Sequence, residues 1–269
     1  MRLLAAFAAL LLSFPNLCAQ QVSAPALYTT QSPQRDPQAL AVLSQAVAAS
    51  GGITTLSAIQ DFRAAGTITY YWAGEEVQGS VSIRGRGTDQ FRLDAELSDG
   101  PTSWAVNKGT GSLKRLNSAN SPIGFHNSRN LAALTWPIAH ILAALSDPSV
   151  SVALVQSPAI DGKQVSHVRI QKQLSQTVPP DALIELYATQ DYLFDSTTGL
   201  LIEVRDRVGA NDSVTPSYAH EIHFAEYQTT NGVTVPMSVS EAVEGQKTWS
   251  LQLSSVTFNA GLQDADFNL

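Results

Sequence analysis

Apolar and polar residues alternate with a period of two in the first half of the chain. Ile68, Tyr70 and Trp72 show the pattern first, each separated from the next by a polar or aromatic residue. This period is typical of strands that present one apolar face. The pattern predicts an antiparallel meander of three strands, with glycine-containing turns between them. The three alternating segments are 66–72, 77–83 and 91–97.

Further alternating segments predict about ten or eleven strands in total, nearly all joined by short hairpins. Trp104 continues the first meander as a fourth strand, whereas 117–127 has no period and is expected to be irregular. The Asn231-Gly232 pair is the clearest hairpin turn in the chain. A meander of this many strands curls, and one that curls without closing leaves a trough wider than its own side chains can fill.

Two segments have helical spacing. The first is expected to begin with Asp36 as N-cap and Pro37 at the first helical position, and to end at Gly51-Gly52. The second, 131–145, has His140 as its only titratable residue, so it is either deeply buried or roofs an apolar space. A short helix is expected at 182–188. The apolar residues of the second segment that we expect to form a lid are Leu131, Leu134, Trp136, Ile138, Ile141, Leu142 and Leu145.

Composition places the chain among exported globular proteins. It has 269 residues, 44% of them hydrophobic and 14% charged, which is enough for one domain with a core. Met1-Arg2, an apolar run and small residues before position 20 predict a secretory signal at 1–19. We expect a flexible arm at 20–35, a single domain at 36–269 and a periplasmic location. Lipoprotein anchoring through Cys18 is the alternative, which Leu17 before the cysteine disfavours.

The candidate chemistry is sparse. The formal net charge of -7 disfavours nucleic acid as a partner, and no serine or cysteine nucleophile stands beside a base. His220 and His223 are expected on opposite faces of one strand, as surface or rim histidines that cannot chelate one ion together. We therefore expect no enzyme, no metal and no cofactor, and no transmembrane segment in the mature chain.

Four groups of residues, spread over most of the chain, resemble the periplasmic carriers of outer-membrane lipoproteins, the LolA/LolB-like group. The first is GSVSIR with FRL, and the second is YLFD with the Gly199-Leu200 pair. The third is FAEY with NGVTVP, and the fourth is FNAGL with Phe267. Their positions are 79–84 with 91–93, 192–195 with 199–200, 224–227 with 231–236, and 258–262 with 267.

The resemblance implies an α+β, mainly β fold: a curved, incompletely closed antiparallel β-barrel with short helices covering its concave face, and acyl chains bound between. Such carriers hold the lid with an arginine, where this chain has Gly85. Arg84 and Arg86 are therefore the candidate lid latches. The alternating residues that we expect to line the lipid cavity are Ile68, Tyr70, Trp72, Val81, Ile83, Phe91, Leu93 and Trp104.

The resulting hypothesis is a periplasmic protein that binds and transfers lipoproteins or other acylated lipids without covalent chemistry. Its partners would be the acylated cargo and membrane-bound donor or acceptor proteins. The alternative is an envelope-stress regulatory protein of the same fold that binds a partner protein. A hydrolase is a third reading, for which the sequence offers no supporting motif.

Overall fold

The computed structural model describes residues 33–269 except for 125, 129–135, 157–158, 161, 163 and 173–185. This part of the chain forms one compact unit, 33–269. The predicted signal segment and most of the arm, with Cys18, lie outside the described residues, as do Leu131 and Leu134 of the expected lid. Of the short helix expected at 182–188, only 186–188 is described, and it is helical.

The described strands form a single antiparallel sheet of 13 strands. Their order is β6-β5-β4-β3-β2-β1-β13-β12-β11-β10-β9-β8-β7, so β6 and β7 are the two end strands of the sheet. The bounds are β1 Asp61–Trp72, β2 Glu75–Arg86, β3 Gln90–Leu97, β4 Gly100–Asn107, β5 Thr110–Arg115, β6 Ser121–Ile123, β7 Val150–Val155, β8 Val165–Lys172, β9 Thr189–Asp195, β10 Leu201–Gly209, β11 Ser217–Thr230, β12 Val233–Val243 and β13 Gln246–Phe258.

The sheet consists of two meanders joined along one seam. Strands β1 to β6 run outward from the seam, β7 to β13 run back to it, and β1 pairs with β13 there. The chain must therefore travel from one edge of the sheet to the other between β6 and β7. Helix α4 (Pro137–Ser146) lies on this connection. The strand order thus requires a long connection here, and the structure shows that it contains a helix.

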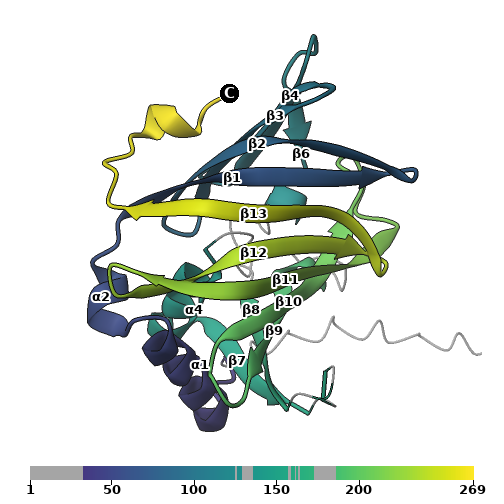
Figure 1. The fold of residues 1–269 in the computed structure, drawn as a ribbon. Helices are drawn as coiled ribbons and strands as arrows, with labels where there is room; N and C mark the ends of the chain where they lie inside the picture. Colours follow the sequence, from purple (N-terminus) through teal and green to yellow (C-terminus); the bar gives the residue numbers. More distant parts are fainter. Residues whose placement is uncertain are drawn as a thin grey trace, which may run out of the picture. The chain divides into compact units, whose positions relative to one another are not determined.

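Helix α1 (Pro37–Ala49) packs against α4 and against strands β7 and β8 (Figure 1). Its predicted start is confirmed, because the Asp36 side chain accepts a hydrogen bond from the backbone N–H of Gln38, and Pro37 occupies the first helical position. Gly51 and Gly52 follow its last turn with φ of 128° and 82°. A second short helix, α2 (Ile53–Ser57), then leads into the sheet.

The core lies between the sheet and these helices. Apolar side chains of α1 and α4 form one cluster with the side chains that alternate along the strands.

The expected fold, mainly β with an unclosed antiparallel sheet and short helices, is confirmed. The count of about ten or eleven strands was too low, partly because the stretch expected to be irregular contains β6. This three-residue edge strand includes Pro122, which is tolerated only at an edge and gives no alternating signal.

The C-terminal segment, 259–269, lies against the outer face of the sheet and contains the 3-10 helix η2 (Asp264–Phe267). Leu262 and Phe267 are buried, at 3% and 1% exposure. The buried Asp61 carboxylate accepts hydrogen bonds from the backbone N–H groups of Ala260, Gly261 and Leu262 at 2.6, 3.1 and 3.0 Å. One acidic side chain of β1 therefore fixes the direction in which the chain leaves β13.

We expect Asp61→Asn to lower the free energy of unfolding by about 1–3 kcal/mol, because an amide cannot accept all three bonds and leaves buried N–H groups without partners. Urea unfolding measures the loss, and limited proteolysis should show faster cleavage after residue 259. Asp89→Asn, in the exposed β2–β3 turn, is the control and should leave both unchanged. Equal effects of the two substitutions would show that the Asp61 contacts do not hold the segment.

Candidate functional site

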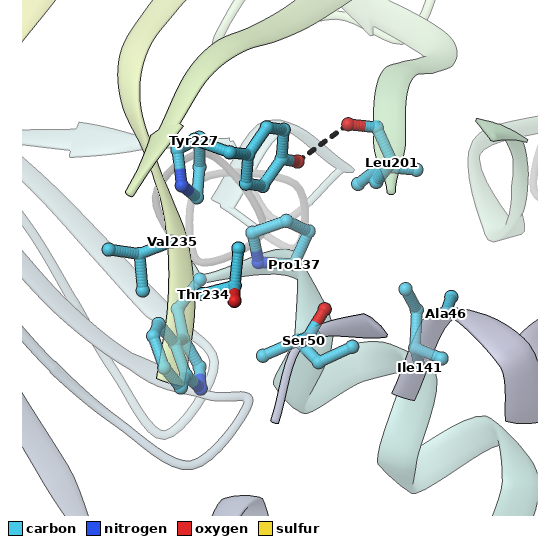
Figure 2. Close-up of a pocket in the computed structure, with 11 residues that line it drawn as sticks. Ala46, Ser50, Pro137, Ile141, Leu201, Tyr227, Thr234 and Val235 are labelled. Carbon is cyan, nitrogen blue, oxygen red and sulfur yellow. Dashed lines mark hydrogen bonds between the residues drawn. The ribbon is translucent and has the colours of Figure 1, made fainter. Parts of the chain in front are cut away.

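A cavity lies beneath the first half of helix α4, where α1 and α4 face the inner surface of the sheet. Figure 2 shows its side chains converging from both helices and from β10, β11 and β12. The polar groups at its rim are few. Tyr227 donates its hydroxyl hydrogen to the backbone oxygen of Leu201 at 2.5 Å. The lining residues are Ala46, Ser50, Trp136, Pro137, Ile138, Ile141, Leu201, Tyr227, Thr234, Val235 and Pro236.

The cavity is small and its walls are mainly apolar. It offers about 20 Å³ to the centre of a water-sized molecule, which is room for about one water. Burial raises the pKa of Tyr227 above its ordinary value, so its hydroxyl stays neutral and remains a donor. In this conformation the cavity is therefore too small for an acyl chain.

Aromatic rings hold the first turn of α4. The Trp136 ring lies 5.4 Å from that of Phe62 on β1 and 5.1 Å from that of Phe258 on β13, measured between ring centroids. These contacts fix the N-terminal end of the helix to the seam of the sheet. These contacts contain no hydrogen bond. Beyond the free energy gained by burying apolar area, each aromatic pair adds only about 1 kcal/mol of stabilisation.

Gly85 explains why Phe62 can take this position. A Cβ atom at Gly85 would lie 2.1 Å from Cε1 of the Phe62 ring, far inside van der Waals contact. Any side chain there would displace the ring that stacks on Trp136. The resemblance to the carriers implies a lid-holding arginine at this position. In this chain, Gly85 instead leaves room for the Phe62 ring that stacks on Trp136.

The other end of α4 is held by an arginine that the sequence reading did not identify. Arg35 donates from Nη1 to the backbone oxygens of Ala144, Asp147 and Val150 at 2.7, 2.9 and 3.1 Å, and from Nη2 to that of Leu145 at 2.9 Å. Carbonyl groups at the end of a helix have no partner within the helix and favour a cation. Backbone pairing between 34–36 and Val152 of edge strand β7 fixes Arg35 itself.

Arg84 and Arg86, the two candidate latches, lie on the outer face. Arg86 donates to the backbone oxygen of Leu262 at 3.0 Å and pairs with Asp264, and Arg84 approaches Asp94 at 3.5 Å. The partners that the structure gives them belong to the strands and the C-terminal segment, and none belongs to the described part of α4. Among the described residues, Trp136 and Arg35 provide the contacts at the two ends of α4.

The residues predicted to line a lipid cavity divide into three groups. Trp72, at the end of β1, is 79% exposed and lies outside the core. Tyr70 and Trp104 are partly buried against the core cluster. The others are packed, so the expected excess of space is not found at these positions. These fully buried residues, each exposed by 4% or less, are Ile68, Val81, Ile83, Phe91 and Leu93.

The expected lid residues are closer to the described cavity. Trp136, Ile138 and Ile141 line it, while Leu142 and Leu145 are partly buried against the core. Their role in lipid binding stays a prediction.

His220 is buried on the inner face at 3% exposure, so its interpretation as a rim residue was wrong. Its Nδ1 lies 2.5 Å from Asp206 Oδ1, and its Nε2 lies 3.0 Å from Glu241 Oε1. Burial alone lowers the pKa of this imidazole, but the bonds to the two carboxylates and their charges outweigh it and raise the pKa to about 10. His220 is thus a buried cation with both nitrogens occupied, and it is not a free base.

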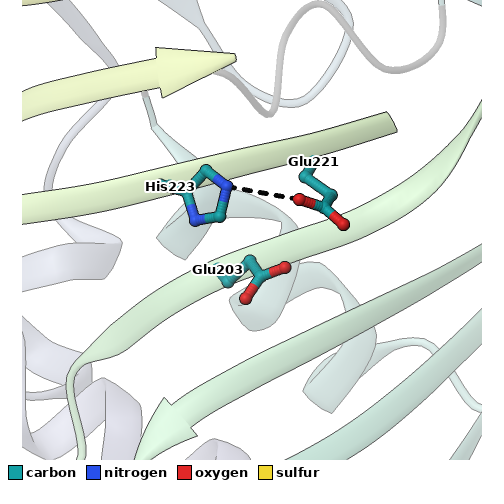
Figure 3. Close-up of side chains that lie close together, drawn as sticks. All are labelled: Glu203, Glu221 and His223. Atoms are coloured by element: carbon teal, nitrogen blue, oxygen red, sulfur yellow. Dashed lines mark ion pairs between the residues drawn. The ribbon is translucent and has the colours of Figure 1, made fainter. Parts of the chain in front are cut away.

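Figure 3 shows a second group, on the outer face, that contains possible metal ligands: Glu203, Glu221 and His223. One ligand atom from each lies within 4.8 Å of the others. Arg205 binds Glu203 through Nε at 2.5 Å and Nη2 at 3.1 Å, so a guanidinium of the same chain already balances this charge. His220 and His223 do face opposite sides of β11, as predicted.

We expect Arg35→Met to lower the free energy of unfolding by about 2–3 kcal/mol, because it leaves four carbonyl oxygens without their charged donor. Backbone amides of α4 should exchange faster with deuterium than in the unmodified protein. Arg63→Met is the control, since the Arg63 side chain is 51% exposed and its nearest acidic oxygen is 3.9 Å away. Unchanged exchange in α4 after Arg35→Met would show that this arginine does not anchor the helix.

We expect His220→Gln to cost the most stability below pH 6.5, where the imidazolium is charged in both states and its contacts favour the folded one. Because the folded pKa is raised to about 10, the advantage of the unmodified protein should shrink steadily between pH 6.5 and 10. Denaturant unfolding across this range measures it. His223→Gln, on the opposite face of the strand, controls for removing a histidine as such. A constant difference between the unmodified protein and His220→Gln across this range would contradict the buried cation.

Comparison with known proteins supports the fold. No family model and no curated sequence matches the chain. The solved structure of a LolA superfamily protein from Nitrosomonas europaea is similar, with 10% identity and a TM-score of 0.54 over 86% of this chain and 97% of that one. A domain from Vibrio parahaemolyticus, titled for outer-membrane lipoprotein sorting, has 15% identity and a TM-score of 0.53 over 85% and 95%.

A DUF1329 family protein from Desulfovibrio piger gives 12% identity and a TM-score of 0.53 over 87% of this chain and 98% of the other. Within the described residues, every helix is too short or too polar to cross a membrane. At such low identities the likeness concerns the fold, and it confirms the resemblance seen in the sequence. The chain has the fold of the LolA superfamily.

Proposed function

We propose that this protein binds the acyl chains of lipoproteins or other acylated lipids between its sheet and helix α4, and transfers them without covalent chemistry. The observation that carries the proposal is the cavity beneath a helix whose two ends are held differently. Arg35 holds one end through four hydrogen bonds. Among the described residues, the contacts that hold the other end are apolar and include the stacking of Trp136 on Phe62 and Phe258. A helix attached in this way opens at its N-terminal end, directly over the cavity.

Opening is necessary for the proposed cargo. The cavity has room for about one water, so an acyl chain enters only if α4 moves away from the sheet. The apolar side chains of α4 and of the sheet then line the enlarged space, and they cover each other again when the cargo leaves. The closed conformation is accordingly the cargo-free state, and binding shifts the population toward the open one.

The energetic need for such a space is large. Each methylene moved from a bilayer into water costs about 0.8 kcal/mol, so a chain of about sixteen carbons costs on the order of 12 kcal/mol. When the acyl chain replaces α4 in contact with the sheet, its burial offsets most of this free-energy cost. The contacts of Trp136 are apolar and contribute little stabilisation. Separating the N-terminal end of α4 from the sheet therefore requires only a small part of the free energy that burying the acyl chain provides.

Three further features support a binding role. The fold likeness includes a domain titled for lipoprotein sorting. The predicted signal segment would take the chain to the periplasm, where donor and acceptor membranes face each other. His220, the buried imidazole on the inner face, has both nitrogens bound to carboxylates, Asp206 and Glu241. An envelope-stress regulator of this fold stays the alternative, and a stable complex with a partner protein would distinguish it.

We expect native mass spectrometry of the exported protein, before any detergent step, to detect bound acyl lipid, and the delipidated protein to bind a fluorescent fatty acid. Ile138→Asp should reduce this binding at least tenfold, because it places a charge in the apolar space. Ala143→Asp puts the same charge on the exposed side of the same helix and should bind normally.

The variants are compared only if both keep a cooperative thermal transition. If Ile138→Asp does not fold, Ile138→Ala serves instead, with a smaller expected loss. An unmodified protein that carries no lipid and does not quench the probe after delipidation would reject the proposed function. Equal binding by Ile138→Asp and Ala143→Asp would place the acyl chain away from α4.

A further inference from the structure

Three aromatic side chains form a group on the inner face of the sheet. Tyr70 on β1 and Trp249 on β13 are directly opposite each other across the seam. Trp104 on β4 contacts both, with ring centroids 5.9 Å from Tyr70 and 6.5 Å from Trp249, in edge-to-face geometry. Tyr70 follows Ile68 on the same face of β1, so the group continues the apolar core along the sheet.

Two hydrogen-bond donors in this group have no acceptor. The Tyr70 hydroxyl and the Trp249 Nε1 are both buried, and neither has a hydrogen-bond partner in the part of the chain that the structure describes. Trp249 as a whole is only 2% exposed. By contrast, the buried hydroxyls of Tyr192 and Tyr227 do have acceptors, Gln190 Oε1 and the Leu201 backbone oxygen. Two neighbouring orphan donors on one wall are unusual, because buried polar groups are normally paired.

The surrounding charges favour a neutral acceptor over an anion. Glu241 is directly opposite Trp249 on β12 and accepts hydrogen bonds from His220 and Thr248. Burial first, and then the charge of Glu241, raises the pKa of Tyr70, whereas Arg115 lowers it. The His220 cation offsets one of the two carboxylates that it binds, Asp206 and Glu241, so one buried negative charge remains. Arg115 is exposed, and water screens its charge. A further carboxylate or phosphate would meet repulsion from the remaining charge, while an uncharged carbonyl oxygen would not.

The distance to the cavity suits a long acyl chain. Val235 lines the cavity beneath α4, and Glu241 lies six residues further along β12, opposite Trp249. At about 3.3 Å for each residue of a strand, this separation is about 20 Å. An extended long-chain acyl group has a comparable length. A chain with its methyl end beneath α4 would therefore place its carbonyl group near the two donors.

We propose that the Tyr70 hydroxyl and the Trp249 Nε1 donate hydrogen bonds to the carbonyl oxygen of a neutral acyl ester or amide, at the end of the acyl chain remote from α4. This inference rests on the proposed function and adds the group that the site recognises. It makes the protein selective for esterified or amide-linked chains over hydrocarbon and over free fatty acid.

The test measures competition against a fluorescent fatty acid on the delipidated full-length protein. The competitors are methyl palmitate, hexadecyl methyl ether, which has no carbonyl, and palmitate, which is anionic. We expect the ester to bind about tenfold tighter than the ether, as one or two hydrogen bonds allow, and tighter than palmitate. Tyr70→Phe should reduce this preference for the ester to about twofold or less while leaving the affinity for the ether unchanged.

Tyr71→Phe is the matched control, because Tyr71 is the next residue of the same strand and its hydroxyl pairs with the Ser250 hydroxyl at 3.0 Å. Its preference for the ester should equal that of the unmodified protein. Equal binding of ester and ether, or an unchanged preference in Tyr70→Phe, overturns the inference and leaves the proposed function standing. If no competitor displaces the probe because the probe itself does not bind, the proposed function fails as well.

The cargo-free proteins provide a second readout that needs no ligand. Tyr70→Phe removes a buried hydroxyl that has no acceptor, so its melting temperature should rise or stay equal. Tyr71→Phe removes a hydroxyl that has a partner, so its melting temperature should fall. A lower melting temperature for Tyr70→Phe would show that its hydroxyl already has an acceptor, and it would overturn the inference.

Discussion

The pairing of β1 with β13 is the constraint on which the rest of the structure depends. It brings the two ends of the sheet-forming chain together and leaves the middle of the chain, β6 and β7, as the end strands of the sheet. The connection between these two strands carries helix α4, which packs against α1 and β7. Helix α4 buries Pro137, Ile138, Ile141 and Ala144. The order of the strands accounts for the long connection on which this helix lies.

The pairing of β1 with β13 also explains how helix α4 is held. One end of α4 reaches the seam, where Phe62 and Phe258 come from the two paired strands and stack on Trp136. The other end reaches the edge strand β7, where Arg35 has been placed by backbone pairing with Val152. An apolar contact separates and re-forms easily in the presence of hydrocarbon, whereas carbonyl groups released from a guanidinium need water or a new donor. The two ends therefore differ in kind as well as in strength.

Local signals in the sequence predicted much of this architecture. The cap at Asp36, the alternation around Ile68 and the Asn231-Gly232 turn each act over a few residues, so each could be read from the sequence. Arg35 could not, since its partners are more than 100 residues away and no period connects them. His220 was misread because a single polar residue at an inner strand position looks like a rim residue until its neighbours on β10 and β12 are known. Trp72 keeps the alternation but lies beyond the end of the core.

The candidate site shows the same division between local and distant information. The apolar character of 131–145 predicted a lid, and Trp136, Ile138 and Ile141 do line the cavity. The cavity lies where α1 and α4 meet residues of β10, β11 and β12, which belong to the second meander. Sequence reasoning placed the space over the first four strands, where Ile83 and Phe91 instead fill the interior. Strand order, which hairpin signals alone do not determine, decides where the cavity lies in this fold.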